Sequence, residues 1–423
     1  MSDSKVPREV VVLDMARHAA GASLRVVRSP VWSELATPIT RSAGWYVQTA
    51  RRHRAALAGL VTVPSIPDVA PDLGLAAQAM IDELILAVAR LSHRPREAEE
   101  MHRIEREVNE ALRLYGREGW LDEPAAYHGD PPPPAAPRIR GARTLSLGYE
   151  VLSFESGYAP HPDEPGRDRY LADQANATAY AWVLRHDEPR PWIVCVHGAG
   201  MGLPFADLHI FRAEWLHRVL GLNVAMPIQA RHGPRRAGSP FGVGFPADDL
   251  MDNVHAVAQS VWDIRRVLAW IREQGDERIG VQGLSLGGYT TALLAGLDED
   301  LACVIVGVPA IDLADLMDRH VSARFRSHEG YENIGALARS ANRVVSPLAI
   351  APLVPRDRRF IYAGLADRMV HPLRQVHALW EHWDEPAINW FRGSHVGFFL
   401  SRPVHDFLGD ALRRSGLVDA EVR

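Results

Sequence analysis

The sequence is most constrained at residues 283–288, where the run Gly-Leu-Ser-Leu-Gly-Gly joins two apolar segments. The segment at 279–281 predicts a strand, and the segment at 289–294 predicts a helix. A sharp turn between them would lift Ser285 clear of both, and it would bring the backbones so close that Gly283 and Gly287 are needed on either side. The free N–H groups at the start of the helix would stabilise an anion beside the serine oxygen. The alternative is a tightly packed connection with an inert serine.

Two side chains that could activate Ser285 follow predicted strands further along the chain. Asp367 ends the turn after a strand predicted at 359–363, and His395 lies in the loop after a strand predicted at 387–391. The carboxyl ends of parallel strands meet at one edge of a sheet, so we expect the three loops to lie together. His395 would take the serine proton during attack and return it to the leaving group. Asp367 would orient the imidazole and stabilise its charged form.

Alternative interpretations exist for the acid and the base. Asp312 and Asp315 also follow a predicted strand, at 302–308, but neither has the strand–turn–aspartate setting of Asp367. A single loop aspartate or histidine is most often structural. The order of Ser285, Asp367 and His395, each just after a strand, favours catalysis.

A glycine-rich turn at 197–202, with the sequence His-Gly-Ala-Gly-Met-Gly, follows the strand predicted at 192–196. Acyl transfer passes through a tetrahedral oxyanion, and glycine lets backbone N–H groups approach that oxygen closely. We expect one N–H donor from Leu286 and a second from Ala199 or Gly200. His197 is interpreted as a structural residue of the turn.

Taken together, these motifs resemble those of the α/β-hydrolase-fold serine hydrolases, in the branch of the esterases and lipases. The matching elements are the H-G-x-G turn, the G-x-S-x-G-G nucleophile elbow, the G-x-x-D loop and the S-H-x-G-F-F histidine loop. The resemblance covers about residues 143–412. It implies a mostly parallel eight-stranded sheet with helices on both faces. It also implies hydrolysis of a carboxylic ester, small or lipid-like, through an acyl-serine, without a metal or organic cofactor.

Other functions remain open at this point. The same three residues could serve an acyltransferase, a thioesterase or a peptidase, and a hydrolase fold can also act as a non-catalytic binding or scaffold protein. A basic cluster after the strand predicted at 222–226 could contact a carboxylate or phosphate of the substrate, although a solvated basic patch is the commoner structure. Its members are Arg231, His232, Arg235 and Arg236.

The first third of the chain has helical periodicity and lies outside the resemblance. Apolar residues recur at helical spacing over 73–91 and again over 101–115, and Pro95 between them suggests a helical hairpin. The proline-rich stretch 131–137 predicts a connector. We therefore expect a helical extension with its linker at 1–137 and a hydrolase domain at 138–423, with a small helical cap inserted at about 311–355. The apolar residues of that cap would suit an apolar substrate, and they are Leu316, Met317, Phe325, Ile334 and Leu337.

The main domain alternates strands with amphipathic helices. Further strands are predicted at 144–151, 177–184 and 278–282, and the most regular helical stripe spans 250–271. Repeated strand–helix–strand units predict a parallel sheet covered on both faces.

Composition narrows the range of partners. The formal net charge is −5, which gives no reason to expect nucleic acid. Both cysteines, Cys195 and Cys303, lie in apolar runs, so no disulfide framework is expected. Residues 1–21 lack a sustained apolar region, which argues against a secretory signal and favours a cytoplasmic location. No uncharged apolar run reaches the roughly 18 residues of a membrane span. The N-terminal helices could still provide peripheral membrane contact or a homodimer interface.

Overall fold

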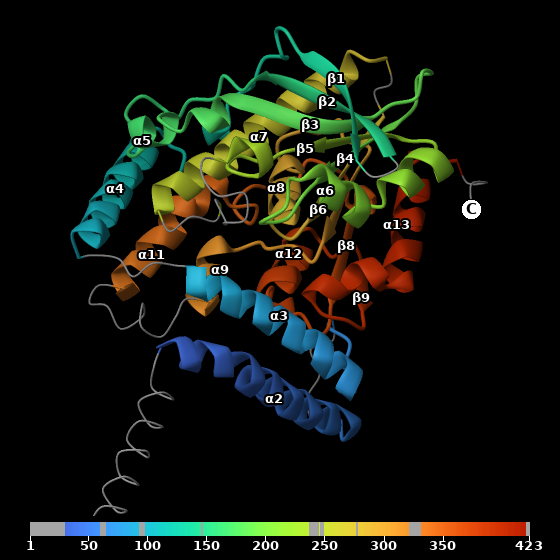
Figure 1. The fold of residues 1–423 in the computed structure, drawn as a ribbon. Helices are drawn as coiled ribbons and strands as arrows, with labels where there is room; N and C mark the ends of the chain where they lie inside the picture. The colour runs from blue at the N-terminus through green and yellow to red at the C-terminus, as the bar shows by residue number, and fades with distance from the viewer. Residues whose placement is uncertain are drawn as a thin grey trace, which may run out of the picture.

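A nine-stranded sheet forms the centre of the molecule (Figure 1). The computed structural model describes residues 30–59, 65–92, 98–144, 147–236, 245, 249–275, 278–320 and 331–419. The strand order is β1-β2-β3-β5-β4-β6-β7-β8-β9. The first three strands and the β3–β5 pair are antiparallel, and the others are parallel. The strands are β1 Arg138–Thr144, β2 Leu147–Glu155, β3 Thr178–Leu184, β4 Trp192–Val196, β5 Asn223–Pro227, β6 Ile279–Leu284, β7 Cys303–Gly307, β8 Arg359–Gly364 and β9 Ala387–Phe391.

The sheet has one strand more than the eight that the sequence implied. The strand predicted at 144–151 is part of a hairpin of β1 and β2, whose residues Leu145 and Ser146 lie outside the described part of the chain. Periodicity misses β1 because its sequence, Arg-Ile-Arg-Gly-Ala-Arg-Thr, has no buried residue. Charged side chains of this kind suit an edge strand, since they discourage pairing with other chains.

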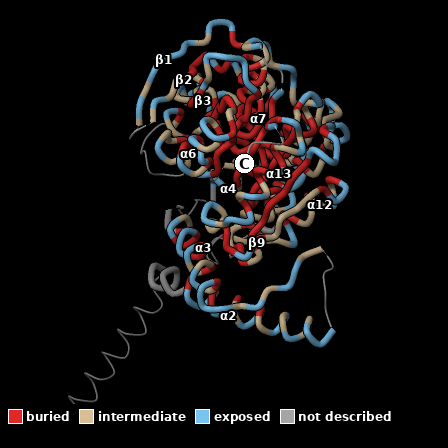
Figure 2. The backbone as a smooth tube through the Cα atoms, turned by 90° about the vertical axis from the view of Figure 1, so that its right-hand side faces the viewer, coloured by how far each residue is buried: buried red, intermediate tan, exposed pale blue. Residues whose placement is uncertain are grey.

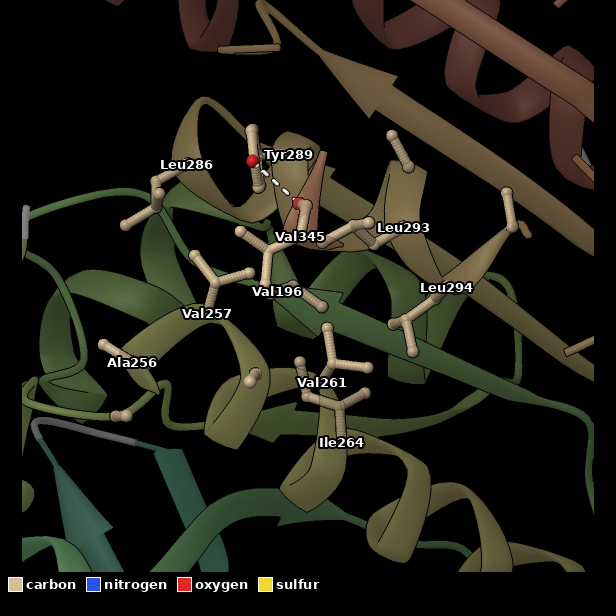
Figure 3. Packing of buried hydrophobic residues seen from close by; sticks show 14 of the residues in the cluster. Val196, Ala256, Val257, Val261, Ile264, Leu286, Tyr289, Leu293, Leu294 and Val345 are labelled. Carbon is tan, nitrogen blue, oxygen red and sulfur yellow. Dashed lines mark hydrogen bonds between the residues drawn. The ribbon is translucent and has the colours of Figure 1, made fainter. Parts of the chain in front are cut away.

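Helices cover both faces of the sheet because the parallel strands are apolar on both sides. Val194 and Val196 of β4 belong to the core under α7 and α8, while Ile193 and Cys195 point to the core under α6 and α13. Figure 3 shows side chains of α7 and α8 packed together with Val196. These helices span Pro204–Ile210 (α6), Leu250–Arg272 (α7), Leu286–Leu294 (α8), His377–His382 (α12) and Arg402–Arg414 (α13).

The described part of the insertion between β7 and β8 includes the helices α9 (Leu313–His320) and α11 (Tyr331–Ala341). Phe325 of the predicted cap lies outside the described residues, as does the N-terminal stretch 1–21. The remaining helical segments are short. They are α5 Arg167–Leu171, η1 Pro124–Tyr127, η2 Gln174–Ala177, η3 Trp215–Val219, η4 Gly233–Arg235, η5 Asn342–Val345, η6 Arg356–Arg358, η7 Pro372–Val376 and η8 His395–Leu400.

The helix before the proline-rich connector, α4 (Ala98–Arg117), packs directly on the main domain. Its residues Ile104, Val108 and Tyr115 are almost fully buried and belong to the same core cluster as α7. The Asp249 side chain caps the start of α7 by accepting N–H groups of residues 251 and 252, and it also binds Arg103 of α4 at 2.7 Å. The domain boundary at residue 137 remains a prediction, because α4 shares the core of the segment that follows it.

Asp249→Ala is expected to lower the free energy of unfolding by about 1–2 kcal/mol, because it removes a helix cap together with ion pairs to Arg103 and Arg169. Burial raises the pKa of Asp249, but the two arginines and the capped N–H groups outweigh burial and hold the pKa below 3.8. The stabilisation should therefore be complete above pH 3.8 and fade as the pH falls through the lower pKa of the folded state. Urea unfolding at a series of pH values across that range measures the difference in the free energy of unfolding between the wild type and the variant. Asp168→Ala, at an exposed position, should change little.

The first two helices of the described residues form a hairpin that differs from the predicted one. α3 (Leu73–Ser92) packs against α2 (Pro30–Leu57), whereas α4 contacts α7 and α11 and lies well apart from them (Figure 1). Much of α2 is exposed or only partly buried (Figure 2). No helix in the described ranges is both long enough and apolar enough to cross a membrane.

The buried face of α3 also differs from its predicted apolar stripe. The helix itself is confirmed, but five aliphatic residues of the stripe are exposed: Leu73, Ile81, Leu84, Ile85 and Val88. The face turned to the protein instead carries Leu75, Ala79, Asp82 and Glu83. Leu86 and Ala87 are buried as well, so α3 docks through polar contacts of its two carboxylates together with apolar contacts.

Candidate active site

Ser285 occupies the turn between β6 and α8 in a backbone conformation that is rare for a residue with a side chain. Its φ is 54° and its ψ is −112°. The conformation is held by backbone hydrogen bonds: its N–H donates to Gly307 at 2.9 Å, and its carbonyl accepts N–H groups of Tyr289 and Ala310, each at 3.1 Å. Strained conformations of this kind persist only where the surrounding structure fixes them, and they cluster at functional sites.

The glycines around the turn have no room for a side chain. A Cβ on Gly283 would lie 2.1 Å from the carbonyl oxygen of Gly287, and one on Gly287 would lie 2.0 Å from that of Val196. The close approach of β6, α8 and β4 therefore depends on both glycines. This close approach explains why positions 283 and 287 are both glycine.

His395 and Asp367 lie next to Ser285, as the order of the loops predicted. The Ser285 Oγ lies 3.0 Å from Nε2 of His395, and Nδ1 of His395 lies 2.7 Å from Oδ2 of Asp367. The other carboxylate oxygen of Asp367 accepts the N–H groups of Met369 and Val370, at 2.9 and 2.7 Å. Asp367 is thus fixed by its own loop, and it fixes the imidazole in turn.

The charge around His395 favours its protonated form. Burial of His395 lowers its pKa, but the carboxylate of Asp367 and then that of Asp82 outweigh burial and raise the pKa above its ordinary value of 6.5. A base that is buried and yet holds a proton well can accept one from a serine hydroxyl.

The glycine-rich turn after β4 lies beside the serine. A Cβ on Gly198 would lie 3.5 Å from the Ser285 Cβ, so the backbone passes close to the hydroxyl. His197 is buried: its Nδ1–H donates to the carbonyl of Gly198 at 2.9 Å, and its Nε2 accepts the N–H of Gln229 at 3.1 Å. Burial lowers the pKa of His197 to about 4, so the ring is neutral. These contacts give His197 a structural role in the turn.

Two curated relatives cover most of the chain. They are uncharacterized proteins of Mycobacterium tuberculosis, strains CDC 1551 and H37Rv, and they are 48% and 47% identical to it over 356 residues. Each alignment covers 84% of this chain and 86% of the relative. The chain belongs to their family. No protein-family model matches the sequence.

Solved structures with a similar arrangement include two acetyl xylan esterases. The one from Paenibacillus sp. R4 is 16% identical, with a TM-score of 0.49 over 71% of this chain and 93% of its own. The one from Thermoanaerobacterium sp. JW/SL YS485 is 14% identical, with a TM-score of 0.45 over 70% of this chain and 98% of its own. The fold is defined by the sheet order and by the strand–turn–helix around Ser285, and not by these distant similarities. The chain has the α/β-hydrolase fold.

The alternative acids Asp312 and Asp315 are engaged elsewhere. Asp312 accepts the N–H of Asp315 at the start of α9, and Asp315 binds Gln375 and Arg374. Within the described residues neither carboxylate contacts the imidazole, whereas that of Asp367 lies 2.7 Å from it. Among the described acids of these loops, Asp367 is therefore the partner of His395.

The basic cluster predicted as a substrate contact is mostly internal. Arg235 is fully buried and paired with Asp263 at 2.7 Å, so it serves the core rather than a substrate. Arg231 binds Asp252 at 2.9 Å and lies over Tyr170. His232 is buried, and burial lowers its pKa to about 3, which leaves it uncharged. Arg236 is partly exposed, as Arg231 is, but unlike Arg231 it has no ion pair within the described residues. A substrate role thus remains a prediction for Arg236.

Two residues of α3 that contact the histidine loop were not identified from the sequence. Oδ2 of Asp82 accepts the N–H of His395 at 2.9 Å, and Oε1 of Gln78 accepts the N–H of Ser394 at 3.2 Å. The available signal is a pair of acids, Asp82 and Glu83, inside a mostly aliphatic helix. Such a pair usually marks a solvated face.

Proposed function

We propose that this protein is a serine hydrolase that cleaves a carboxylic ester, small or lipid-like, through an acyl-serine intermediate on Ser285. The observation that carries the proposal is the continuous chain of hydrogen bonds from Ser285 through His395 to Asp367, with lengths of 3.0 and 2.7 Å. This chain begins at a serine held at a positive φ at the start of a helix. Serine, base and orienting acid within hydrogen-bond reach are the signature of an activated nucleophile.

In the first half of the reaction, Oγ of Ser285 attacks the ester carbonyl while its proton passes to Nε2 of His395. The imidazolium is stabilised by the carboxylate of Asp367, which keeps its own negative charge. The C–O bond to the alcohol then breaks, and the proton on Nε2 passes to the departing oxygen. An acyl group remains on Ser285.

The negative oxygen of the tetrahedral intermediate would lie at the start of α8. We assign its donors to the N–H of Leu286, the first residue of that helix, and to the N–H of Ala199 or Gly200 in the adjacent turn. In the second half, His395 takes a proton from water, the hydroxide attacks the acyl carbon, and the proton returns to Ser285 as the acid leaves.

Covalent labelling tests this proposal on the full-length protein. A fluorophosphonate probe is expected to modify Ser285, as read by peptide mass, and nitrophenyl esters of increasing acyl length should be hydrolysed and report the preferred acyl chain. Ser340→Ala, which alters an exposed serine of α11, should label like the wild type. A folded protein that neither labels at Ser285 nor hydrolyses any ester of the series would disprove the proposal.

A further inference from the structure

Asp82 of α3 contacts the backbone of both loops that complete the hydrogen-bond chain. A single oxygen, Oδ2, accepts the N–H of His395 at 2.9 Å and the N–H of Arg368, the residue after Asp367, at 3.0 Å. These contacts join positions 313 and 286 residues apart in sequence. One carboxylate therefore ties the loop of the acid to the loop of the base.

Neighbouring residues of α3 reinforce this attachment. The carboxylate of Glu83 binds the guanidinium of Arg368 at 3.0 Å, and Oε1 of Gln78 accepts the N–H of Ser394. A Cβ on Gly397 would lie 2.6 Å from that amide oxygen, so the histidine loop and the helix touch. The polar face of α3 is thus complementary to these two loops.

Asp82 also acts on His395 by charge. Its side chain is fully buried, and no hydrogen-bond partner of Oδ1 is found among the described residues. Burial and the neighbouring charge of Asp367 raise the pKa of Asp82 to about 6, against the opposing effect of His395 and the two N–H donors. The charges that act on Asp82 include those of Asp367 and His395, while the neighbouring Glu83 carboxylate is paired with Arg368 and Arg41. The Asp82 carboxylate therefore adds to the negative potential at the imidazole.

We propose that Asp82 is a positioning residue of the active site, which holds the His395 and Asp367 loops in register and stabilises the imidazolium through its charge. This inference rests on the proposed function of Ser285, His395 and Asp367. It makes α3 an obligatory part of the active site, although the helix lies far outside the segment that carries the motifs.

The pH dependence of kcat/KM separates a charge effect from a merely structural one. The acidic limb reports the pKa of the essential base in the free enzyme. Asp82→Asn keeps the size of the side chain and an oxygen that can accept N–H groups, but it removes the negative charge. The imidazolium then loses stabilisation, the pKa of His395 falls, and the acidic limb should move to lower pH. Glu99→Gln removes an exposed charge from α4 and should leave the limb in place.

A second variant tests the positioning itself. Asp82→Ala removes both backbone contacts, and a misplaced base should reduce kcat by about 100-fold above the acidic limb with little change in KM. Asp82→Asn should retain a clearly larger share of kcat there. If the alanine variant does not fold, as judged by circular dichroism, the asparagine variant decides alone.

An acidic limb that stays in place in folded Asp82→Asn would overturn the charge effect, and wild-type kcat in folded Asp82→Ala would overturn the positioning role. Failure of the proposed function looks different, because the wild type itself would then not react with the fluorophosphonate probe at Ser285.

Discussion

Ser285→Ala is expected to lower kcat for ester hydrolysis by about 10⁶-fold, the order of loss that follows removal of the nucleophile from a serine–histidine–aspartate site. The expectation follows from the 3.0 Å contact of Oγ with His395, since no other atom of residue 285 can form the acyl bond. His395→Ala should cost about as much, and the double variant no more than either single one, because the two residues act as a unit. Steady-state hydrolysis of the preferred nitrophenyl ester measures all three.

Two aspartate variants provide the matched control. Asp367→Asn should lower kcat by about 10⁴-fold, since an amide in place of the carboxylate favours the wrong tautomer of His395. Asp312→Asn should leave kcat unchanged, because within the described residues the Asp312 side chain accepts the N–H of Asp315 at the start of α9 and asparagine can do the same. Equal losses in the two variants would show that the acid has been assigned incorrectly.

Most of the fold follows from short-range patterns in the sequence. The parallel strands are buried apolar runs, and the loops after β6, β8 and β9 hold Ser285, Asp367 and His395 within a few residues of a strand end. Strand order then brings those loops to one edge of the sheet. The proximity of the three side chains could be predicted because each position depends on local sequence and on a general rule of parallel sheets.

The contribution of α3 could not be predicted in this way. Periodicity identified the helix and its aliphatic stripe, but this stripe is not the buried face, since Ile81, Leu84 and Val88 are exposed. The buried side includes Asp82, which contacts backbone N–H groups more than 280 residues away, and a backbone amide leaves no mark in the sequence. Similarly, the sequence around Arg235 does not show that this cation is buried, because its partner Asp263 belongs to α7.

The closest backbone approach in the active site predicts a large loss of stability. Gly287→Ala would place a methyl group 2.0 Å from the carbonyl oxygen of Val196, at the end of β4. Neither backbone can withdraw, since α8 is packed against α7 and β4 is paired with β5 and β6. We expect the free energy of unfolding to fall by about 3 kcal/mol or more, as measured by urea unfolding.

The matched control is Gly335→Ala in α11, where, beyond the adjacent residues and the helix backbone, no atom of the described part of the chain lies within 4 Å of the added Cβ. This change should stabilise the protein by up to about 1 kcal/mol, because alanine favours a helix over glycine. Any Gly287→Ala protein that folds should also react poorly with the fluorophosphonate probe. Relief of the overlap between the added methyl group and the Val196 carbonyl would move α8 away from the turn at Gly198, and the expected oxyanion donors would then lie farther apart. If Gly287→Ala has wild-type stability and labelling, the turn has room for a side chain. The close approach of α8 to β4 would then not be what holds Ser285 in its strained conformation.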